Sequence, residues 1–377
     1  MFKQIIKILI VTLFSQSVFA QNKFNLKCKN NIIKNGYAIL APSYSNKILY
    51  DFAIKNDSVK ISNYKFSFSG KISYPQTFYI KMIDTNSKSY YLEDFFIDQS
   101  EINLEIDSSI KAHNVFSVFS QGVKVNKSLS NDEYFKEYLP SFISLNKKID
   151  TIFNLYSSKS SSNDTIKLNF IKERDSCRNI RDTLLYRYSL KNKHSSILPW
   201  MLYQHIEKYG YKYIYQRTFD NMVWSNSRFK RNMQYYLNQS KNISINKIIP
   251  EKNKIIKSLK NKDHAKYILI DFWFSSCQPC LKQFEDFRSI YSKFHPLGFE
   301  IIAISVDEKS QLKKYKSILE NKNYPWVQIL DINKSISSNF KLNKFPYNIL
   351  LNKEGKVLKI DIEPIELNEY LNNELLK

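Results

Sequence analysis

The chain is poor in cysteine, in glycine and in long apolar runs. Four of its 377 residues are cysteine and six are glycine. A small secreted scaffold held by disulfides carries far more cysteine for its length, so that class is excluded. Beyond residue 20 no stretch has the roughly 20 consecutive apolar residues that a bilayer span requires. The fold must therefore rest on apolar cores, for which 43% hydrophobic and 15% aromatic residues are ample.

Acidic residues are scarce relative to basic ones, with 35 Asp and Glu against 57 Lys and Arg and a formal net charge of +22. The lysines are spread along the whole chain, among abundant Asn, Ile and Ser, which indicates compositional bias rather than a binding patch. No nucleic-acid-binding motif accompanies them, so we expect no nucleic-acid partner. A modest attraction to anionic membrane surfaces or acidic partners remains.

The first 20 residues have the pattern of a secretory signal peptide. Met1-Phe2-Lys3 supplies a basic start, the stretch from Ile8 to Phe14 is apolar, and Val18 and Ala20 are small. The apolar part is too short for a membrane anchor. We therefore predict cleavage after Ala20 and export to the periplasm or cell envelope. The residue directly after the cleavage site is Gln21 and not a cysteine, so a lipid anchor is not expected.

Residues 21–125 alternate apolar and polar positions with a period of two, as in Phe66-Ser67-Phe68 and Ile102-Asn103-Leu104-Glu105-Ile106. Runs broken by Asn, Asp, Ser and Gly about every ten residues predict an antiparallel β-sandwich or barrel. The segment holds no catalytic or metal-binding constellation, and His113 is expected at the surface or in a turn. We treat it as a β-rich domain of unknown role.

Residues 126–247 change to a helical period, with further helices predicted over 168–190, 197–209 and 228–237. The many tyrosines and two tryptophans of this segment are consistent with a glycan-binding surface, but packing between helices is the simpler explanation. We predict a helical connector or docking region.

Cys28 and Cys177 lie in two different predicted regions. They either form a structural bridge or remain buried free thiols, and the sequence leaves both alternatives open.

Residues 248–377 form the third region, in which strand-like and helix-like segments alternate. This order predicts an α/β fold with a mixed central sheet flanked by helices. The predicted strands cover 267–274, 299–306, 326–330, 347–351 and 356–360, and the predicted helices cover 277–294, 310–320, 334–340 and 367–376.

A Cys-Gln-Pro-Cys sequence stands where the first of these strands meets the first helix. A thiol at that junction meets unpaired backbone N–H groups and the positive end of the helix dipole, which both favour the thiolate. Cys277 and Cys280 are close enough to share one helical turn. Pro279 is tolerated there because the first turn does not need its N–H.

Asp271-Phe272-Trp273 before this pair, and Phe345-Pro346-Tyr347 before a later strand, complete a recognisable pattern. Residues 248–377 resemble the thioredoxin fold, and most closely the TlpA/ResA-like group of extracytoplasmic thiol–disulfide oxidoreductases. The β-rich start resembles a domain of unclear role that precedes such thioredoxin domains in envelope proteins of Gram-negative bacteria.

The resemblance implies a redox-active disulfide between Cys277 and Cys280. Cys277 is then the attacking thiolate, and Cys280 resolves the mixed disulfide. Asp271 matches a buried carboxylate that assists proton transfer at the second cysteine, and its dry setting implies a raised pKa. Gln278 and Pro279 tune the redox potential.

The same resemblance implies that Trp273, Phe345 and Pro346 bind the substrate. The Phe345–Pro346 bond is expected to be cis, which exposes a backbone edge for a substrate strand. The implied partners are proteins that carry disulfides or thiols, and a membrane-bound electron donor that would make the protein a reductant. The motif itself does not give the direction of electron flow, because oxidants and isomerases share the architecture. No cofactor is implied.

Three departures from the family are expected to alter substrate contacts and proton handling. Ser276 replaces the Trp that often precedes the first cysteine, and Gln283 stands where the TlpA/ResA-like group often has Glu. The strand over residues 299–306 lacks the Lys that thioredoxin pairs with its buried Asp.

Other readings of the cysteine pair are weaker. His264 and His295 flank the pair but form no compact ligand set, so we expect no zinc or other metal. A peroxiredoxin would need Thr three residues before the reactive cysteine, where this chain has Phe274. The alternative function is a protein whose first 245 residues bind an envelope partner or glycan, with an accessory thioredoxin-like domain.

Overall fold

The computed structural model describes residues 22–44, 46–107, 123–158, 164–259, 263–340, 342 and 344–376. The predicted signal peptide and His113 lie outside these residues. Among the residues described, no helix is both long and apolar enough to cross a membrane.

The chain divides into two compact units. One unit comprises Met1–Ser144, Leu184–Tyr203 and Thr218–Met233, and the other comprises Leu145–Thr183, Gln204–Arg217 and Gln234–Lys377. The helical residues predicted as one connector therefore contribute to both units. The domain boundaries after residues 125 and 247 remain predictions.

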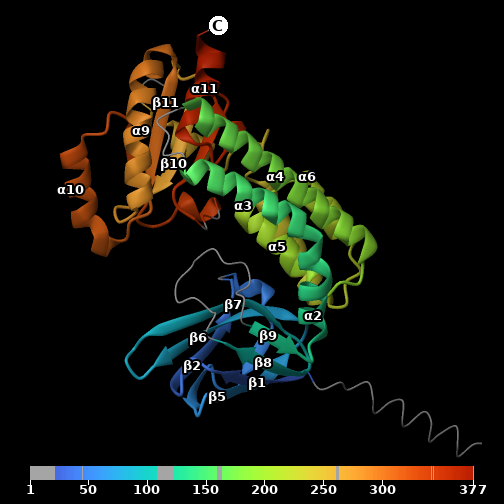
Figure 1. Cartoon of the computed structure of the whole chain (residues 1–377). Coiled ribbons are helices and arrows are strands. Elements are labelled where there is room, and N and C mark those ends of the chain that lie inside the picture. Colours follow the sequence, from blue (N-terminus) through green and yellow to red (C-terminus); the bar gives the residue numbers. More distant parts are fainter. Residues whose placement is uncertain are drawn as a thin grey trace, which may run out of the picture. The chain divides into compact units, whose positions relative to one another are not determined.

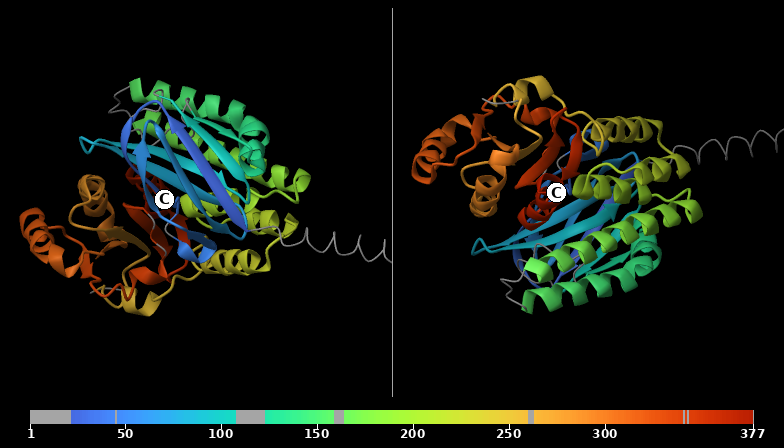
Figure 2. Two further views of the ribbon diagram at one scale, coloured as in Figure 1. Left: turned by 90° about the horizontal axis from the view of Figure 1, so that it is seen from below. Right: turned by 90° about the horizontal axis from the view of Figure 1, so that it is seen from above.

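The first unit is built on one curled sheet of nine strands, coloured blue to green in Figures 1 and 2. Its strands are β1 Lys23–Asn30, β2 Asn35–Pro42, β3 Phe52–Ile54, β4 Ser58–Ser62, β5 Lys65–Ile72, β6 Gln76–Asp84, β7 Ser89–Ile97, β8 Glu101–Ile106 and β9 Val123–Asn126, with a short 3-10 turn η1 at Lys47–Leu49. They lie in the order β7-β6-β2-β4-β5-β1-β8-β9, and β3 pairs with β5. The predicted β-rich start is confirmed, but β1 and β8 pair in parallel, which an all-antiparallel prediction misses.

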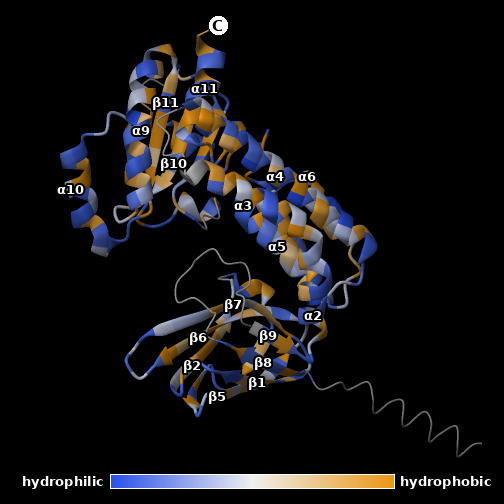
Figure 3. Ribbon diagram, in the orientation of Figure 1, coloured by the Kyte–Doolittle hydropathy of each residue, from blue (hydrophilic) through white to orange (hydrophobic). Residues whose placement is uncertain are grey.

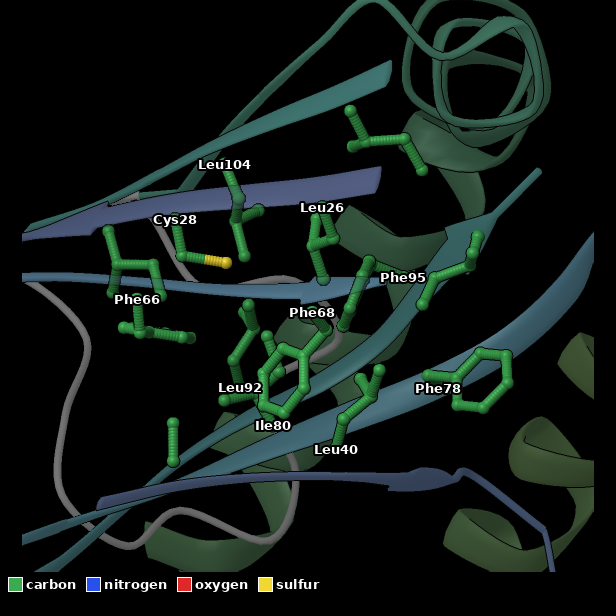
Figure 4. Packing of buried hydrophobic residues seen from close by; sticks show 14 of the residues in the cluster. Leu26, Cys28, Leu40, Phe66, Phe68, Phe78, Ile80, Leu92, Phe95 and Leu104 are labelled. Atoms are coloured by element: carbon green, nitrogen blue, oxygen red, sulfur yellow. The ribbon is translucent and has the colours of Figure 1, made fainter. Parts of the chain in front are cut away.

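Alternation along these strands places one apolar face in the core, as the period-two pattern predicts. In β1 the buried positions include Phe24, Leu26 and Cys28. The Cys28 side chain points into the core beside Leu26 and Leu104 (Figure 4). Cys28 and Cys177 are both buried free thiols, so the bridge is not formed. Burial raises the pKa of the Cys28 thiol far above its ordinary value, which leaves it unreactive.

Helices follow the sheet in the sequence. They are α2 Leu129–Asp132, the π-helical turn η2 Glu133–Tyr138, the 3-10 turn η3 Leu139–Phe142, α3 Ile143–Ser158, α4 Asp164–Lys191, α5 Leu198–Tyr209, α6 Tyr213–Asn221, α7 Ser227–Lys241 and α8 Lys252–Ile256. Gly210, at φ +72°, follows α5 as a left-handed cap. Trp200 is fully buried and donates its Nε1–H to the Pro75 carbonyl at 2.8 Å, so this aromatic side chain serves packing.

The second unit contains the α/β fold predicted for the C-terminal region. Its elements are β10 Tyr267–Trp273, α9 Gln278–Phe294, η4 His295–Leu297, β11 Phe299–Ser305, η5 Lys309–Gln311, α10 Leu312–Lys322, β12 Val327–Leu330, η6 Ser337–Asn339, β13 Tyr347–Asn352, β14 Val357–Ile360 and α11 Pro364–Leu375. The strand order is β12-β11-β10-β13-β14. β12, β11 and β10 run parallel, whereas β13 is antiparallel to both β10 and β14.

The predicted helix over 334–340 is only the short turn η6. The carboxylate of Asp331 accepts the backbone N–H groups of Ile336, at 3.1 and 3.2 Å, and of Ser337, at 2.7 Å. Because those N–H groups bond to a side chain, they do not enter a regular helical ladder.

The central sheet is apolar on both faces, and β10 and β11 are coloured hydrophobic in Figure 3. Leu269 and Trp273 of β10 belong to the cluster that contains buried residues of α9 and α11. The alternate residues Ile268, Ile270 and Phe272 belong to the cluster on the opposite face. A strand buried on both sides usually has a continuous apolar sequence. Asp271 is the one charged residue of β10 and so departs from this pattern.

Candidate active site

The cysteine pair lies where β10 gives way to α9. Cys277 is the N-cap residue of α9, and its Sγ accepts the backbone N–H of Cys280 at 3.2 Å. Cys277 and Cys280 form a disulfide with their Cα atoms 5.3 Å apart. The structure therefore brings the two predicted sulfurs together in the first turn of the helix.

The two sulfurs differ in access. Cys277 is 5% exposed and Cys280 is completely buried. Gln278 and Pro279, which separate them, are exposed. An incoming partner therefore contacts Cys277 first. Cys280 is not accessible to the partner and reacts only with the sulfur of Cys277.

The surroundings of Cys277 favour negative charge on its sulfur. The first turn of α9 has no acidic residue, and the helix N-terminus carries a partial positive charge. The ammonium group of Lys314, on α10, donates to the Ser276 hydroxyl at 3.1 Å. A cation thus lies beside the residue that precedes Cys277, a feature the sequence analysis missed because Lys314 follows it by 37 residues.

Asp271 lies in the middle of β10 and is completely buried. Its carboxyl oxygens have no hydrogen-bond partner among the residues that the structure describes. Burial, and then the negative charge of Asp361, raise the pKa of Asp271 well above its ordinary value. The raised pKa expected from the resemblance is thus supported by the packing around the carboxyl.

Asp271 shares a sheet face with the cysteine pair. Leu269 and Trp273, two residues to either side of it, belong to the apolar cluster that contains Cys277 and Cys280. Side chains two apart on a strand point the same way, so the carboxyl is directed toward α9. Asp271 is therefore a buried acid on the face of the sheet that packs against Cys280 and the rest of α9.

The Phe345–Pro346 peptide bond is cis, as expected. Both residues are half-buried, and the Phe345 ring meets Phe274 edge to face with centroids 5.2 Å apart. Phe274 follows β10 directly, three residues before Cys277. The loop before β13 is therefore held against the segment that leads to the cysteine pair.

Trp273 is completely buried, with its ring against Phe284 and Tyr315 at centroid distances of 5.2 and 5.8 Å. In this state it supports the cysteine pair from within the core and offers no surface to a substrate.

A polar network that the sequence analysis missed fixes the loop before Cys277. The Asp307 carboxylate accepts the backbone N–H of Ser275 at 2.9 and 3.0 Å and the Ser275 hydroxyl at 2.7 Å. It also accepts the Ser305 hydroxyl at 2.7 Å. All three side chains are completely buried. The only signal in the sequence is an Asp just after a strand, which is too common to single out.

Gln283, a departure from the family pattern, is half-buried on α9. Its Oε1 is buried and has no partner among the described residues. The described part of the chain contains no group of three or more His, Cys, Asp and Glu side chains suited to a metal ion.

The fold and the paired cysteines together define a thioredoxin-like domain. Residues 264–357 match the protein family described as "Thioredoxin-like", so the C-terminal part of the chain is a thioredoxin-like domain. The resemblance read from the sequence is confirmed for this domain. Residues 25–134 match a second family, described as "Domain of unknown function (DUF4369)".

Curated relatives of this chain include two proteins named as thiol-disulfide oxidoreductases. The thiol-disulfide oxidoreductase ResA of Bacillus subtilis (strain 168) is 31% identical over 116 residues, which cover 29% of this chain and 61% of that protein. The chain therefore spans less than two thirds of the length of that relative. ResA of Bacillus cereus (strain ATCC 10987 / NRS 248) is 25% identical over 150 residues, which cover 38% of this chain and 84% of that protein.

Solved structures also align with this chain. The thioredoxin domain of a thiol-disulfide oxidoreductase from Bacteroides vulgatus is 28% identical, with a TM-score of 0.28, and the alignment covers 31% of this chain and 84% of that one.

Proposed function

We propose that this protein is an exported thiol–disulfide oxidoreductase that exchanges electrons with protein disulfides through Cys277 and Cys280, acting as a reductant. The observation that carries the proposal is the disulfide at the N-terminus of α9, with a buried acid, Asp271, on the same face of the sheet. The names of the ResA relatives support the reaction class.

The proposed reaction has two exchange steps. The Cys277 thiolate attacks a sulfur of the partner disulfide, so one partner sulfur leaves as a thiolate and a mixed disulfide forms. Cys280 then loses its proton to the Asp271 carboxylate, and its thiolate attacks the Cys277 sulfur. The second partner thiolate leaves, and both partner thiolates take up protons from solvent, which balance the protons lost by Cys277 on ionisation and by Cys280 through Asp271. The partner gains two electrons and two protons, and the Cys277–Cys280 disulfide results.

Substrate contact falls to the exposed rim of the pair. Gln278 and Pro279 are exposed beside Cys277, and Phe345 and Pro346 are half-buried across from it. A substrate segment that lies along the backbone before Pro346 places its own disulfide at Cys277.

The setting is proposed from the sequence. The signal-peptide pattern over the first 20 residues supports export to the periplasm or cell envelope, with cleavage after Ala20. A reductant in that compartment needs electrons from elsewhere, so we infer a membrane-bound dithiol donor that returns the pair to the reduced state.

The proposal is tested with the mature chain, reduced and mixed with a disulfide-containing protein substrate. We expect wild-type turnover, no turnover for Cys277→Ser, and a trapped mixed disulfide for Cys280→Ser. Full turnover by Cys277→Ser would overturn the proposal and favour the envelope-binding alternative.

The direction of electron flow needs a separate measurement. We expect the Cys277–Cys280 pair to have a reduction potential near that of thioredoxin, roughly −270 mV. A potential near that of a strong oxidant, roughly −120 mV, would contradict the reductant role while leaving disulfide exchange intact.

A further inference from the structure

A row of side chains crosses the central sheet at the level of Asp271. Asp271 on β10 is in register with Asn348 on β13 and with Ala303 on β11, and Ala303 is in register with Gln328 on β12. The order across the sheet is therefore Asn348, Asp271, Ala303, Gln328.

All four side chains lie on the α9 face of the sheet. Leu350 and Leu330, two residues beyond Asn348 and Gln328, pack in the cluster that contains Ala303 and the cysteine pair. Side chains two apart on a strand share a face, so Asn348 and Gln328 point the same way as Asp271.

On the β13 side of Asp271, the amide of Asn348 already has hydrogen-bond partners of its own. Asn348 donates from Nδ2 to the Ile362 carbonyl at 3.1 Å and accepts the Ile362 N–H at Oδ1, at 2.9 Å. Its amide is thus committed to the loop that follows β14.

On the β12 side, the polar groups lack hydrogen-bond partners. Both amide atoms of Gln328 are buried without a hydrogen-bond partner among the described residues, as are both carboxyl oxygens of Asp271. Leaving such groups unpaired costs about 1–3 kcal/mol each. Native proteins rarely accept that cost and bridge such atoms with an ordered water.

Ala303 leaves room for such a bridge. Adjacent strands lie about 4.8 Å apart, so roughly 10 Å separates the Asp271 and Gln328 backbones. Ala303, the residue between them in the sheet, contributes only a methyl group. A longer side chain at this position would extend between the carboxyl and the carboxamide.

We propose that Gln328 is a positioning residue for proton transfer at Asp271, its carboxamide holding a water over Ala303 that hydrogen bonds the carboxyl. The inference rests on the proposed function, because it assigns a route for the proton that Asp271 takes from Cys280. β12 is the edge strand of the sheet, so the bridge runs from the buried carboxyl toward the edge of the sheet.

The bridge opposes the forces that keep Asp271 protonated. A donor to the carboxylate stabilises the charged form, whereas burial and the charge of Asp361 destabilise it. Within the described chain, Asp361 is the charged group that acts on Asp271. The titratable side chains buried in the cluster on its face of the sheet are the two cysteines, Tyr291, Tyr315 and Tyr324. β11 and β12 present only Ala303 and Gln328 at this level.

The experiment measures Asp271 directly, by its carboxyl carbon resonance in the oxidised mature protein as pH is raised. We expect Gln328→Met, which keeps the length but removes both polar atoms, to raise the Asp271 midpoint by about one pH unit. Ala303→Ser places a hydroxyl beside the carboxyl and is expected to lower it. Lys359→Met, at an exposed position of β14, is the control and should leave the midpoint unchanged.

The kinetic readout is the rate at which Cys280 resolves a preformed mixed disulfide. Gln328→Met should move the pH profile of this step upward by the same amount, and should have no further effect in an Asp271→Asn background. An unchanged Asp271 midpoint in Gln328→Met overturns the inference even if disulfide exchange proceeds normally. A shifted midpoint in a protein without exchange activity would support the bridge and refute the proposed function instead.

Discussion

Replacing Asp271 with Asn tests the role of the buried carboxyl through its effect on stability. The folded protein holds the Asp271 proton more tightly than the unfolded chain does, because burial and Asp361 raise the folded pKa. Above the unfolded pKa of about 3.9, the folded state therefore binds more protons, and the free energy of unfolding falls as pH rises.

The slope of this loss is about 1.4 kcal/mol per pH unit, and it continues until pH reaches the folded pKa of Asp271. Asn cannot ionise, so Asp271→Asn lacks this term. We expect the variant to gain stability relative to wild type from about pH 4 upward, with a difference that grows with pH until the folded pKa is passed. Because the side chain is completely buried, solvent screening does not reduce the effect.

The assay is urea denaturation of the oxidised mature protein at half-unit steps from pH 4 to pH 9, for wild type and Asp271→Asn. Glu300→Gln serves as control, because Glu300 is also buried but hydrogen bonds Tyr291. Parallel wild-type and Asp271→Asn curves over this whole range would refute the reasoning, since they would show that Asp271 titrates alike in the folded and unfolded chains.

Three further predictions concern neighbours of the cysteine pair. Asp307→Ala leaves buried donors unpaired and should lower the free energy of unfolding by about 3 kcal/mol, measured by urea denaturation; an unchanged midpoint would show that the network contributes nothing. Lys314→Met removes a cation near Cys277 and should raise the pKa of that thiol slightly, measured by alkylation rate against pH in the reduced protein; persistence of the shift in high salt would contradict a Coulombic cause. Asp361→Asn removes the negative neighbour of Asp271 and should lower its pKa, followed by the same carboxyl resonance, with a rise in pKa counting against the assignment.

The sequence predicted most of the C-terminal fold because its signals there are local. Continuous apolar runs mark β10 and β11, and the Cys-x-x-Cys pair marks the start of α9. The helix predicted over 334–340 failed for a reason that is also physical. Asp331 takes backbone N–H groups that a helix would have used, and helical periodicity alone does not reveal that competition.

The parts that could not be predicted depend on pairings distant in sequence. Ser275 and Asp307 are 32 residues apart, and their contact exists only because β10 and β11 lie in register. The parallel pairing of β1 with β8 brings Cys28 next to Leu104, and no local pattern announces it. Burial of Cys28 within that sheet then decides between the bridge and the free thiol.

The strand next to Asp271 has no lysine that could pair with its carboxyl, and this affects the pKa of Asp271. The register partner on β11 is Ala303, so no cation on that strand holds the carboxyl in its charged form. Burial and Asp361 therefore dominate, and the carboxyl is kept protonated to higher pH than a lysine neighbour would allow. A protonated Asp271 cannot take a proton from Cys280. Resolution of the mixed disulfide should consequently accelerate as pH rises through the Asp271 pKa, which makes the second exchange step, rather than the first attack by Cys277, the one that responds to the carboxyl.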